Sequence, residues 1–261
     1  MKEQNNIYAV IVLYNKNCKD SITYNCLQGY EGVNNLVCDN STKDFQNKKI
    51  VEENGNIYID MKGNKGISKA YNASLDKIKG QKGIICFFDD DTDIPESYFK
   101  ILLKSAENNP ADIYMPIVKY EIGILSPCVI NNVNVRRPKT MEEINGKNIT
   151  GINSGMAIGL SIFEDYRYDE NYFLDYVDHK FLRDMKEKKK KIKIFDIELK
   201  QSFSGNDFSD LKSSLNRFKI YEEDYRRFCS DNFKNRLIGE INIFKRKLKL
   251  IYKFRSFKFL K

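Results

Sequence analysis

Histidine, tryptophan and proline are scarce in this chain of 261 residues, which contains one His, no Trp and five Pro. The single histidine, His179, excludes a zinc site built from several histidines and leaves any His-based catalytic triad dependent on one residue. A metal ion would therefore be held mainly by oxygen ligands, which favours Mg²⁺ or Mn²⁺.

Paired cysteines and long apolar runs are also missing. The six cysteines show no C-x-x-C spacing, and several lie inside apolar runs, where a free thiol behaves as a small hydrophobic side chain. No apolar run approaches the roughly 18 residues needed to cross a bilayer, and the N-terminus lacks a signal-peptide cleavage pattern. We therefore expect a cytoplasmic protein.

Positive charge is concentrated near the C-terminal end. The formal net charge of the chain is +8, and residues 233–261 contain ten Lys or Arg against Glu240 alone, a net of +9. Subtracting +9 from +8 leaves residues 1–232 at −1, so most of the chain is nearly neutral. Nucleic-acid binding is not expected, because no recognised binding motif accompanies the basic segment.

The basic segment also carries an apolar pattern. Its large apolar residues recur with 4-3-4-3 spacing, as on one face of a helix, at Leu237, Ile241, Phe244, Leu248 and Ile251. Two interpretations stay open. The helix could pack on the rest of the protein with a solvated basic face, or it could lie on an anionic membrane surface. In the second case the protein would be peripheral on the inner face of the cell membrane.

Short apolar runs alternate with amphipathic stretches through the first half. The runs predict strands at 7–13, 35–39, 56–61 and 83–89, and the stretches between them predict helices at 18–29, 43–54 and 66–79. This alternation predicts an α/β fold with right-handed crossovers and a mostly parallel central sheet flanked by helices, similar to a Rossmann fold.

The second half is less regular. Pro95 favours a helix that starts there with Thr92 or Asp93 as its cap, and residues 111–118 read as a strand. The polar stretch 131–150 lacks periodicity and is predicted to be a long loop. The remaining elements are predicted to be a helix at 175–190 and helices from 209 onward.

Polar residues stand at the predicted carboxyl ends of the strands, where ligands bind in such sheets. The most unusual group is the run of four aspartates behind the fourth strand, at Asp89, Asp90, Asp91 and Asp93. The other strand ends carry Tyr14 and Asn15, Asp39, and Asn64 with Gly66. Each could also be an ordinary Asx turn, cap or turn glycine.

The aspartate run fits one motif better than its competitors. A D-D-x-x-D motif of prenyl-diphosphate enzymes belongs on a helix, whereas these residues follow a strand. A D-x-D-x-T reading fails because Asp93 stands where Thr is required, and an EF-hand loop lacks its glycine and its terminal glutamate. A strand-end D-x-D of Asp89 and Asp91 remains, with a divalent ion bridging them to a diphosphate. Asp90 would point the other way.

Six segments of the sequence carry a resemblance to a known family. They are AVIVLYN, LVCDNS, NKGISKAYNASL, FFDDDT, INSGMAIGLSIF and NYFLDYVDHKFLRDMKEKKKKI. In their order and rough spacing they resemble glycosyltransferase family 2, which has the GT-A fold, and most of all its bacterial rhamnosyltransferase-like branch of polysaccharide enzymes. The resemblance covers about residues 7–205.

The resemblance implies roles for individual residues in binding a nucleotide-sugar donor. Asp39 would contact the nucleobase, Asn64 and Gly66 would belong to a donor loop, Asp89 would contact the ribose, and Asp91 would hold Mn²⁺ or Mg²⁺. The wider donor-binding set implied by the resemblance also includes Tyr14, Asn15, Asn72 and Asp90.

The family inverts the anomeric carbon, with an aspartate as general base toward the acceptor hydroxyl. The base is best sought in FLDYVDHKFLRDM, where Asp178 would share a helical stripe with Leu174, Leu182 and Met185. Asp175 is the second choice. Otherwise Asp175 would be the helix cap and Asp178 an acid favoured by the helix dipole.

The chain departs from the family pattern at two places. Gln201 stands where many members have a metal-binding histidine, so that Asp89 and Gln201 are only possible ligands beside Asp91. An arginine that is usual after the base is displaced, with Arg183 one position early.

The resemblance implies an inverting, metal-dependent glycosyltransferase of the hexosyltransferase type. It would transfer a sugar from dTDP-rhamnose or a UDP-sugar to a glycan or lipid-linked glycan in surface or capsular polysaccharide synthesis. We expect a catalytic domain at 1–205, with a donor-binding half at 1–118 and an acceptor and base half at 119–205, followed by a basic helical extension at 206–261. A non-catalytic nucleotide-sugar-binding or scaffold protein and a nucleotidyltransferase stay open as alternatives.

Overall fold

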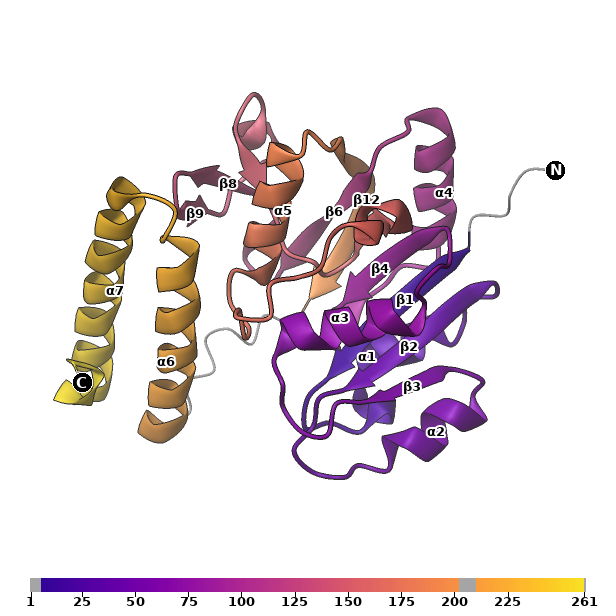
Figure 1. The fold of residues 1–261 in the computed structure, drawn as a ribbon, viewed down its shortest axis with the longest axis horizontal. Coiled ribbons are helices and arrows are strands. Elements are labelled where there is room, and N and C mark those ends of the chain that lie inside the picture. The colour runs from indigo at the N-terminus through magenta and orange to yellow at the C-terminus, as the bar shows by residue number, and fades with distance from the viewer. Residues whose placement is uncertain (1–5, 202–209, 261) are drawn as a thin grey trace.

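The structure is a computed structural model that describes residues 6–201 and 210–260. The expected boundary between residues 205 and 206 lies outside the described residues. Figure 1 shows a central sheet with helices on both sides and a pair of C-terminal helices beside it.

The first four strands form the parallel part of the sheet. They are β1 (Ile7–Leu13), β2 (Val33–Asp39), β3 (Ile57–Asp60) and β4 (Ile84–Phe88), in the spatial order β3-β2-β1-β4. The intervening helices are α1 (Ile22–Leu27), α2 (Asn47–Glu53) and α3 (Ile67–Lys77), with a short 3₁₀ turn η1 (Cys18–Asp20) before α1. In-register pairing aligns Leu13 with Asp39 and Asp39 with Asp60, so these strands end at one edge.

The other strands complete the sheet. They are β11 (Met156–Gly159), which is antiparallel to β4, then β6 (Ile113–Tyr120), β12 (Ile192–Gln201), and the short β5 (Thr92–Asp93) and β7 (Gly123–Ser126) at its margins. The pairings make β3, β2, β1, β4, β6 and β12 run in one direction and β11, β5 and β7 in the other. The predicted α/β fold with a mostly parallel sheet is confirmed.

Both faces of the sheet are buried, which explains why its strands are continuously apolar. One face packs Val10, Phe87 and Ile158 against α3 and α5 (Val177–Glu187). The other packs Ile11, Phe88 and Ala157 against α1 and α4 (Tyr98–Asn108).

Residues 131–150 are not the long loop that we predicted. They contain β9 (Asn134–Arg136), a 3₁₀ turn η2 (Met141–Ile144) and β10 (Ile149–Thr150), and β9 and β10 flank β8 (Cys128–Asn131) in a second small sheet. Asn132 adopts a positive φ of 52°, as a tight turn between β8 and β9 requires. Strands of only two or three residues have too little periodicity to be recognised.

Two predicted helix starts are also wrong. Thr92 and Asp93 do not cap a helix but form the edge strand β5, and α4 begins at Tyr98 after Ser97. The cap of α5 is Tyr176, with a φ of 63°, so Asp175 is not the N-cap and Leu174 is not on the helix. Leu174 therefore does not share a helical stripe with Asp178.

The C-terminal helices are α6 (Leu211–Phe228) and α7 (Phe233–Phe254), followed by a 3₁₀ turn η4 (Phe257–Leu260). They form an antiparallel hairpin beside α5 and the β8–β9 strands (Figure 1). Asp210 and Asn232 cap the two helices by accepting backbone N–H bonds. Aromatic side chains join α6 to the start of α5, where Tyr176 stacks on Tyr225 and Phe228 at 4.8 and 4.9 Å between ring centroids.

Within the two described ranges, no helix combines the length and the apolar character that crossing a membrane requires.

Candidate active site

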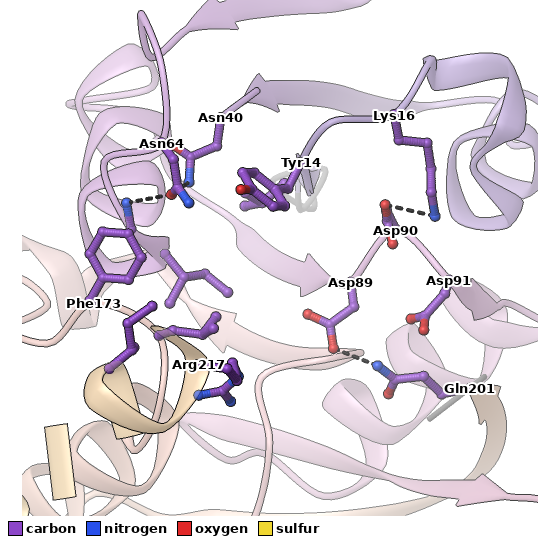
Figure 2. Close-up of a pocket in the computed structure, with 15 residues that line it drawn as sticks. Tyr14, Lys16, Asn40, Asn64, Asp89, Asp90, Asp91, Phe173, Gln201 and Arg217 are labelled. Carbon is purple, nitrogen blue, oxygen red and sulfur yellow. Dashed lines mark hydrogen bonds and ion pairs between the residues drawn. The ribbon is translucent and has the colours of Figure 1, made fainter. Parts of the chain in front are cut away.

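A cavity of about 530 Å³ lies at the carboxyl ends of β1, β2 and β4. Its walls come from these strand ends, the first turn of α3, the segment before α5, the last residue of β12, and α6 (Figure 2). The lining residues are Val12, Tyr14, Lys16, Asn40, Asn64, Gly66, Ile67, Asp89, Asp90, Asp91, Phe173, Leu174, Gln201, Arg217 and Ile220. The topology explains the location, because parallel strands that end at one edge leave a crevice there.

The aspartate loop after β4 is held by hydroxyl groups of α1 and its cap. Ser21 Oγ donates to the backbone carbonyl of Asp90 at 2.7 Å, and Thr23 Oγ1 donates to those of Asp89 and Thr92 at 2.5 and 2.9 Å. These bonds fix the backbone, so the direction of each carboxylate follows from its place in the turn.

The three carboxylates that line the cavity have different partners. Asp90 is turned toward Lys16, with 2.9 Å between the two charged groups, whereas Asp89 and Asp91 face Gln201 (Figure 2). Gln201 Nε2 donates to Asp89 Oδ2 at 2.6 Å. Burial, and next the negative charge of Asp91, raise the pKa of Asp89 to about 7. Burial also raises the pKa of Asp91.

Two oxygen atoms of this group fit a divalent cation. Asp91 Oδ1 and Gln201 Oε1 are both buried without a hydrogen-bond partner, and both can only accept. Buried acceptors without partners are costly, and a hard cation with oxygen ligands would relieve that cost. The described ranges contain no group of three or more His, Cys, Asp or Glu side chains placed to hold a metal ion.

The opposite wall is a network around the start of α3. Asn40 Nδ2 donates to Asn64 Oδ1 at 3.0 Å, and Asn40 Oδ1 accepts from the backbone N–H of Lys65 at 2.7 Å. Gly66 has a φ of 89°, and a Cβ there would stand 2.7 Å from the carbonyl oxygen of Phe173. Gly66 therefore allows the segment before α5 to pack against α3.

The first N–H groups of α3 already have partners. The N–H of Gly66 donates to Asn64 Oδ1 at 3.2 Å, and that of Ile67 donates to the carbonyl of Phe173 at 2.7 Å. These bonds hold the backbone at Gly66 closely against its neighbours. The two N–H groups could contact a phosphate only if their hydrogen bonds to Asn64 and Phe173 were broken.

Helix α6 is fastened to the segment that forms this wall. Asp224, which is 2% exposed, accepts backbone N–H bonds from Phe173, Leu174 and Asp175 at 2.9, 2.8 and 2.8 Å. Arg217 forms a two-pronged ion pair with Asp175, in which Nη2 lies 2.7 Å from Oδ1. Arg217 also lines the cavity, so α6 places a guanidinium group in the same site as the aspartates.

Some of the expected donor-binding residues lie outside the cavity lining. Asp39 is buried and accepts from the Ser41 N–H, Asn47 Nδ2 and Tyr58 Oη at 3.1, 2.9 and 3.1 Å. Asp39 therefore links β2, its own strand, to Asn47 of α2 and Tyr58 of β3.

Asn15 and Asn72 have similar internal partners. Asn15 Oδ1 accepts from the N–H and hydroxyl of Thr42, both at 2.9 Å. Asn72 Nδ2 donates to the carbonyl of Tyr168 at 2.9 Å, and its Oδ1 accepts from the N–H of the same residue at 3.0 Å. Asn72 thus joins α3 to the segment before α5.

Asp178 lies in the first turn of α5 and is not among the residues that line the cavity. Its side chain is 21% exposed, and its Oδ1 accepts from the N–H of His179 at 2.8 Å. Burial raises the pKa of Asp178, while the neighbouring His179 acts in the opposite direction. The charge of Asp178 is a further, smaller cause of the raised pKa of Asp89, after burial and the charge of Asp91.

Eight lining residues were not anticipated as site residues, and four of them are polar or aromatic: Lys16, Asn40, Phe173 and Arg217. Asn40 directly follows β2, and Lys16 lies three positions after the end of β1. Neighbouring residues at both strand ends were selected, so the same signal could have included these two. Nothing in the sequence pairs Arg217 with Asp175, because the two residues are 42 positions apart on separate elements.

Three comparisons relate the chain to known proteins. Residues 8–167 match the model of the family described as glycosyl transferase family 2. A search of curated protein sequences gave no significant match.

Several solved structures share the fold at low sequence identity. The structure of S. aureus TarS is 16% identical with a TM-score of 0.54, over 88% of this chain and 44% of that one. TarS residues 1–349 in complex with UDP are 15% identical with a TM-score of 0.54, over 95% and 72% of the two chains. GalNAc-T7 with UDP, GalNAc and Mn²⁺ is 14% identical with a TM-score of 0.59, over 78% and 45%.

These likenesses show the GT-A fold, and the chain spans less than half the length of the full TarS and GalNAc-T7 structures. The family model covers more than half of the chain, including the strand ends that form most of the cavity. The chain belongs to glycosyl transferase family 2.

Proposed function

We propose that this protein is an inverting glycosyltransferase that moves a sugar from a nucleotide-diphosphate donor to a hydroxyl of a glycan or lipid-linked glycan. The observation that carries the proposal is the cavity in which Asp89 and Asp91 share a rim with two cationic side chains, Lys16 and Arg217. A donor of the dTDP-rhamnose or UDP-sugar type and a role in surface or capsular polysaccharide synthesis agree with the resemblance. UDP bound to TarS and to GalNAc-T7 supports a nucleotide-sugar donor.

In this proposal the donor diphosphate lies between the aspartate loop and α6. Lys16 and Arg217 each have a carboxylate partner, Asp90 and Asp175, and each lines the cavity. A diphosphate could share these cations through charge-assisted hydrogen bonds. Tyr14, which is 51% exposed, offers a ring face on which a nucleobase could stack.

Mn²⁺ or Mg²⁺ would be held by Asp91, with Asp89 and Gln201 Oε1 as further oxygen ligands. The Mn²⁺ in the GalNAc-T7 structure supports a divalent ion in this fold. When bound, the cation supplies positive charge that stabilises the nucleoside diphosphate as it leaves.

Asp178 is the proposed general base. Its carboxylate would take the proton of the acceptor hydroxyl as that oxygen bonds to the anomeric carbon and the bond from this carbon to the diphosphate breaks. The raised pKa of Asp178 brings its basicity closer to what proton transfer near neutral pH requires. Asp175, the second choice, has both oxygens engaged by Arg217, which makes it the less available base.

The proposal is tested by incubating the protein with UDP-, dTDP- or GDP-sugars, Mn²⁺ or Mg²⁺ and a pool of glycan acceptors, and measuring nucleoside diphosphate release. Acceptor-dependent release and a product with inverted anomeric configuration are expected. Donor binding without turnover in any combination would favour the non-catalytic nucleotide-sugar-binding or scaffold alternative. Pyrophosphate release from a nucleoside triphosphate would instead indicate a nucleotidyltransferase.

A further inference from the structure

The outward face of α7 carries a line of large apolar side chains. Their exposed fractions are 54% for Leu237, 46% for Ile241, 54% for Phe244, 49% for Leu248 and 76% for Tyr252. At 100° per residue, these five positions fall within an arc of about 80° and form one continuous face, called here the outer stripe. A contiguous exposed apolar face of this kind marks an interaction surface.

The outer stripe is not the face by which α7 packs on the protein. Gly239, Ile243 and Leu250 are buried in the helix hairpin, on a side about 160° away from the centre of the stripe. A Cβ at Gly239 would stand 2.8 Å from Cys229 Sγ, so the two helices approach closely there. Helix α7 therefore packs on the protein through Gly239, Ile243 and Leu250, whereas the outer stripe points away from it.

Positive charge borders the outer stripe. Lys234, Lys245 and Lys249 are exposed and lie within about 60° of one edge of the stripe. The single acid of residues 233–261, Glu240, is engaged by Arg226 of α6 at 2.8 and 3.1 Å. It therefore does little to offset the net charge of +9 in this segment.

An anionic lipid surface matches this arrangement of groups. An apolar stripe bordered by lysines lies in the plane of a membrane interface, with the stripe among the acyl chains and the lysines at the headgroups. Exposed aromatic rings at both ends of the segment, Phe233 at 75% and Phe257 at 73%, suit the same interface. A second copy fits less well, because a symmetric contact would bring two segments of charge +9 together.

We propose that the outer stripe of α7 and its flanking lysines dock this protein on a membrane surface that contains anionic lipid. Docking of this kind places the protein on a bilayer without a spanning helix. The proposal does not depend on the proposed reaction, because vesicle binding is measured without donor or acceptor.

Flotation of the full chain with vesicles tests the proposal. Binding to mixed phosphatidylcholine–phosphatidylglycerol vesicles is expected to exceed binding to phosphatidylcholine alone by roughly tenfold or more, and to weaken as salt rises. The double variant Ile241→Ser/Phe244→Ser removes the centre of the stripe and is expected to weaken binding by roughly tenfold. The variant Lys245→Glu/Lys249→Glu is expected to abolish the preference for anionic vesicles.

The control is Ile122→Ser, because Ile122 is 84% exposed on another part of the described chain. It should bind vesicles as the wild type does. Circular dichroism should show the same melting temperature for all variants, since the substituted side chains are exposed. Equal binding to both vesicle types, or unchanged binding by the stripe variant, would overturn the proposal. So would a solution dimer that the stripe variant dissociates, because the stripe would then be a self-association surface.

Discussion

At the residue scale, the aspartate run separates into distinct environments. Asp89 and Asp91 share Gln201 as a neighbour, Asp90 pairs with Lys16, and Asp93 is exposed on β5. Successive side chains that leave a strand are expected to point in alternate directions. Asp89 and Asp91 accordingly lie toward Gln201, and Asp90 lies toward Lys16. Burial, and next the negative charge of Asp91, raise the pKa of Asp89, and a nearby cation would lower it again.

Asp91→Asn tests the cation site. Asp91 Oδ1 is buried without a hydrogen-bond partner, and the substitution removes the negative charge of this carboxylate. The transfer rate with Mn²⁺ should therefore fall by roughly 10²-fold or more. The stabilisation that Mn²⁺ confers on the donor complex should fall with it, as measured by thermal shift. Asp93→Asn, two positions away and exposed, should leave both quantities unchanged. Equal loss in the two variants would contradict a site at Asp91.

Asp178→Asn tests the base. The turnover number should fall by roughly 10²- to 10⁴-fold, because the amide cannot accept the proton, while donor affinity measured by calorimetry persists. Full activity in this variant would refute the assignment.

The pH dependence of turnover gives a second readout of Asp178. The carboxylate is active when deprotonated, so activity is present above its pKa in the folded protein and is lost as the pH falls through it. Because burial raises that pKa, the acid limb should lie above the ordinary value of 3.8. Asp178→Asn should remove this limb from the residual rate.

Several residues that were selected from predicted strand ends line the cavity. Tyr14, Asn64, Gly66 and the aspartates Asp89–Asp91 could be proposed because they follow apolar strands, and they line the cavity. Asp39 also follows a strand, but its side chain turns into the protein toward Asn47 and Tyr58. The direction of a strand-end side chain depends on partners from other elements, which the sequence pattern does not contain.

At the element scale, α6 is the unexpected contributor to the site. It was expected in a separate extension, yet it supplies Arg217 and Ile220 to the cavity and Asp224 to the segment before α5. The amphipathic pattern predicted the helix itself. Its packing depends on pairs such as Phe173 with Asp224, which are 51 positions apart and have no local signature.

Asp224→Ala measures how strongly α6 holds that segment. Three partly buried N–H groups would lose their acceptor, and the free energy of unfolding should fall by about 3 kcal/mol. Urea unfolding gives the value directly. The exposed neighbour Glu223 provides the matched control, since Glu223→Ala should change stability little. If Asp224→Ala lowered the free energy of unfolding no more than Glu223→Ala does, the three bonds would not stabilise the contact between α6 and residues 173–175.

Arg217→Ala tests whether α6 takes part in donor binding. Removing the guanidinium should raise the donor KM by roughly tenfold, because one charge-assisted contact to the diphosphate is lost. Arg217→Lys should recover only part of the affinity, because an ammonium group lacks the planar fork. If the Arg217→Ala variant folds normally and keeps the wild-type KM, Arg217 does not bind the donor, and its role is the ion pair with Asp175.

At the scale of the whole molecule, the order of elements determined most of the predicted fold. Four strands with intervening helices predict a parallel sheet with right-handed crossovers, and the confirmed fold contains one. The spatial order β3-β2-β1-β4 was not predicted. The insertion of β11 between β4 and β6 and the small second sheet were not predictable, since antiparallel partners far apart in sequence are selected by tertiary packing. One side of the cavity is therefore formed by β1, β2 and β4, which the sequence pattern predicts well. The other side is formed by β12 and α6, whose positions depend on contacts between residues far apart in the sequence.

Calorimetric titration of the protein with UDP-, dTDP- and GDP-sugars, with and without Mn²⁺, shows directly whether the cavity binds a nucleotide sugar. We expect saturable binding of at least one nucleotide sugar, tightened by Mn²⁺ and weakened in both Asp91→Asn and Arg217→Ala. Absence of binding by every donor, or binding that neither substitution weakens, would contradict a donor site between the aspartate loop and α6.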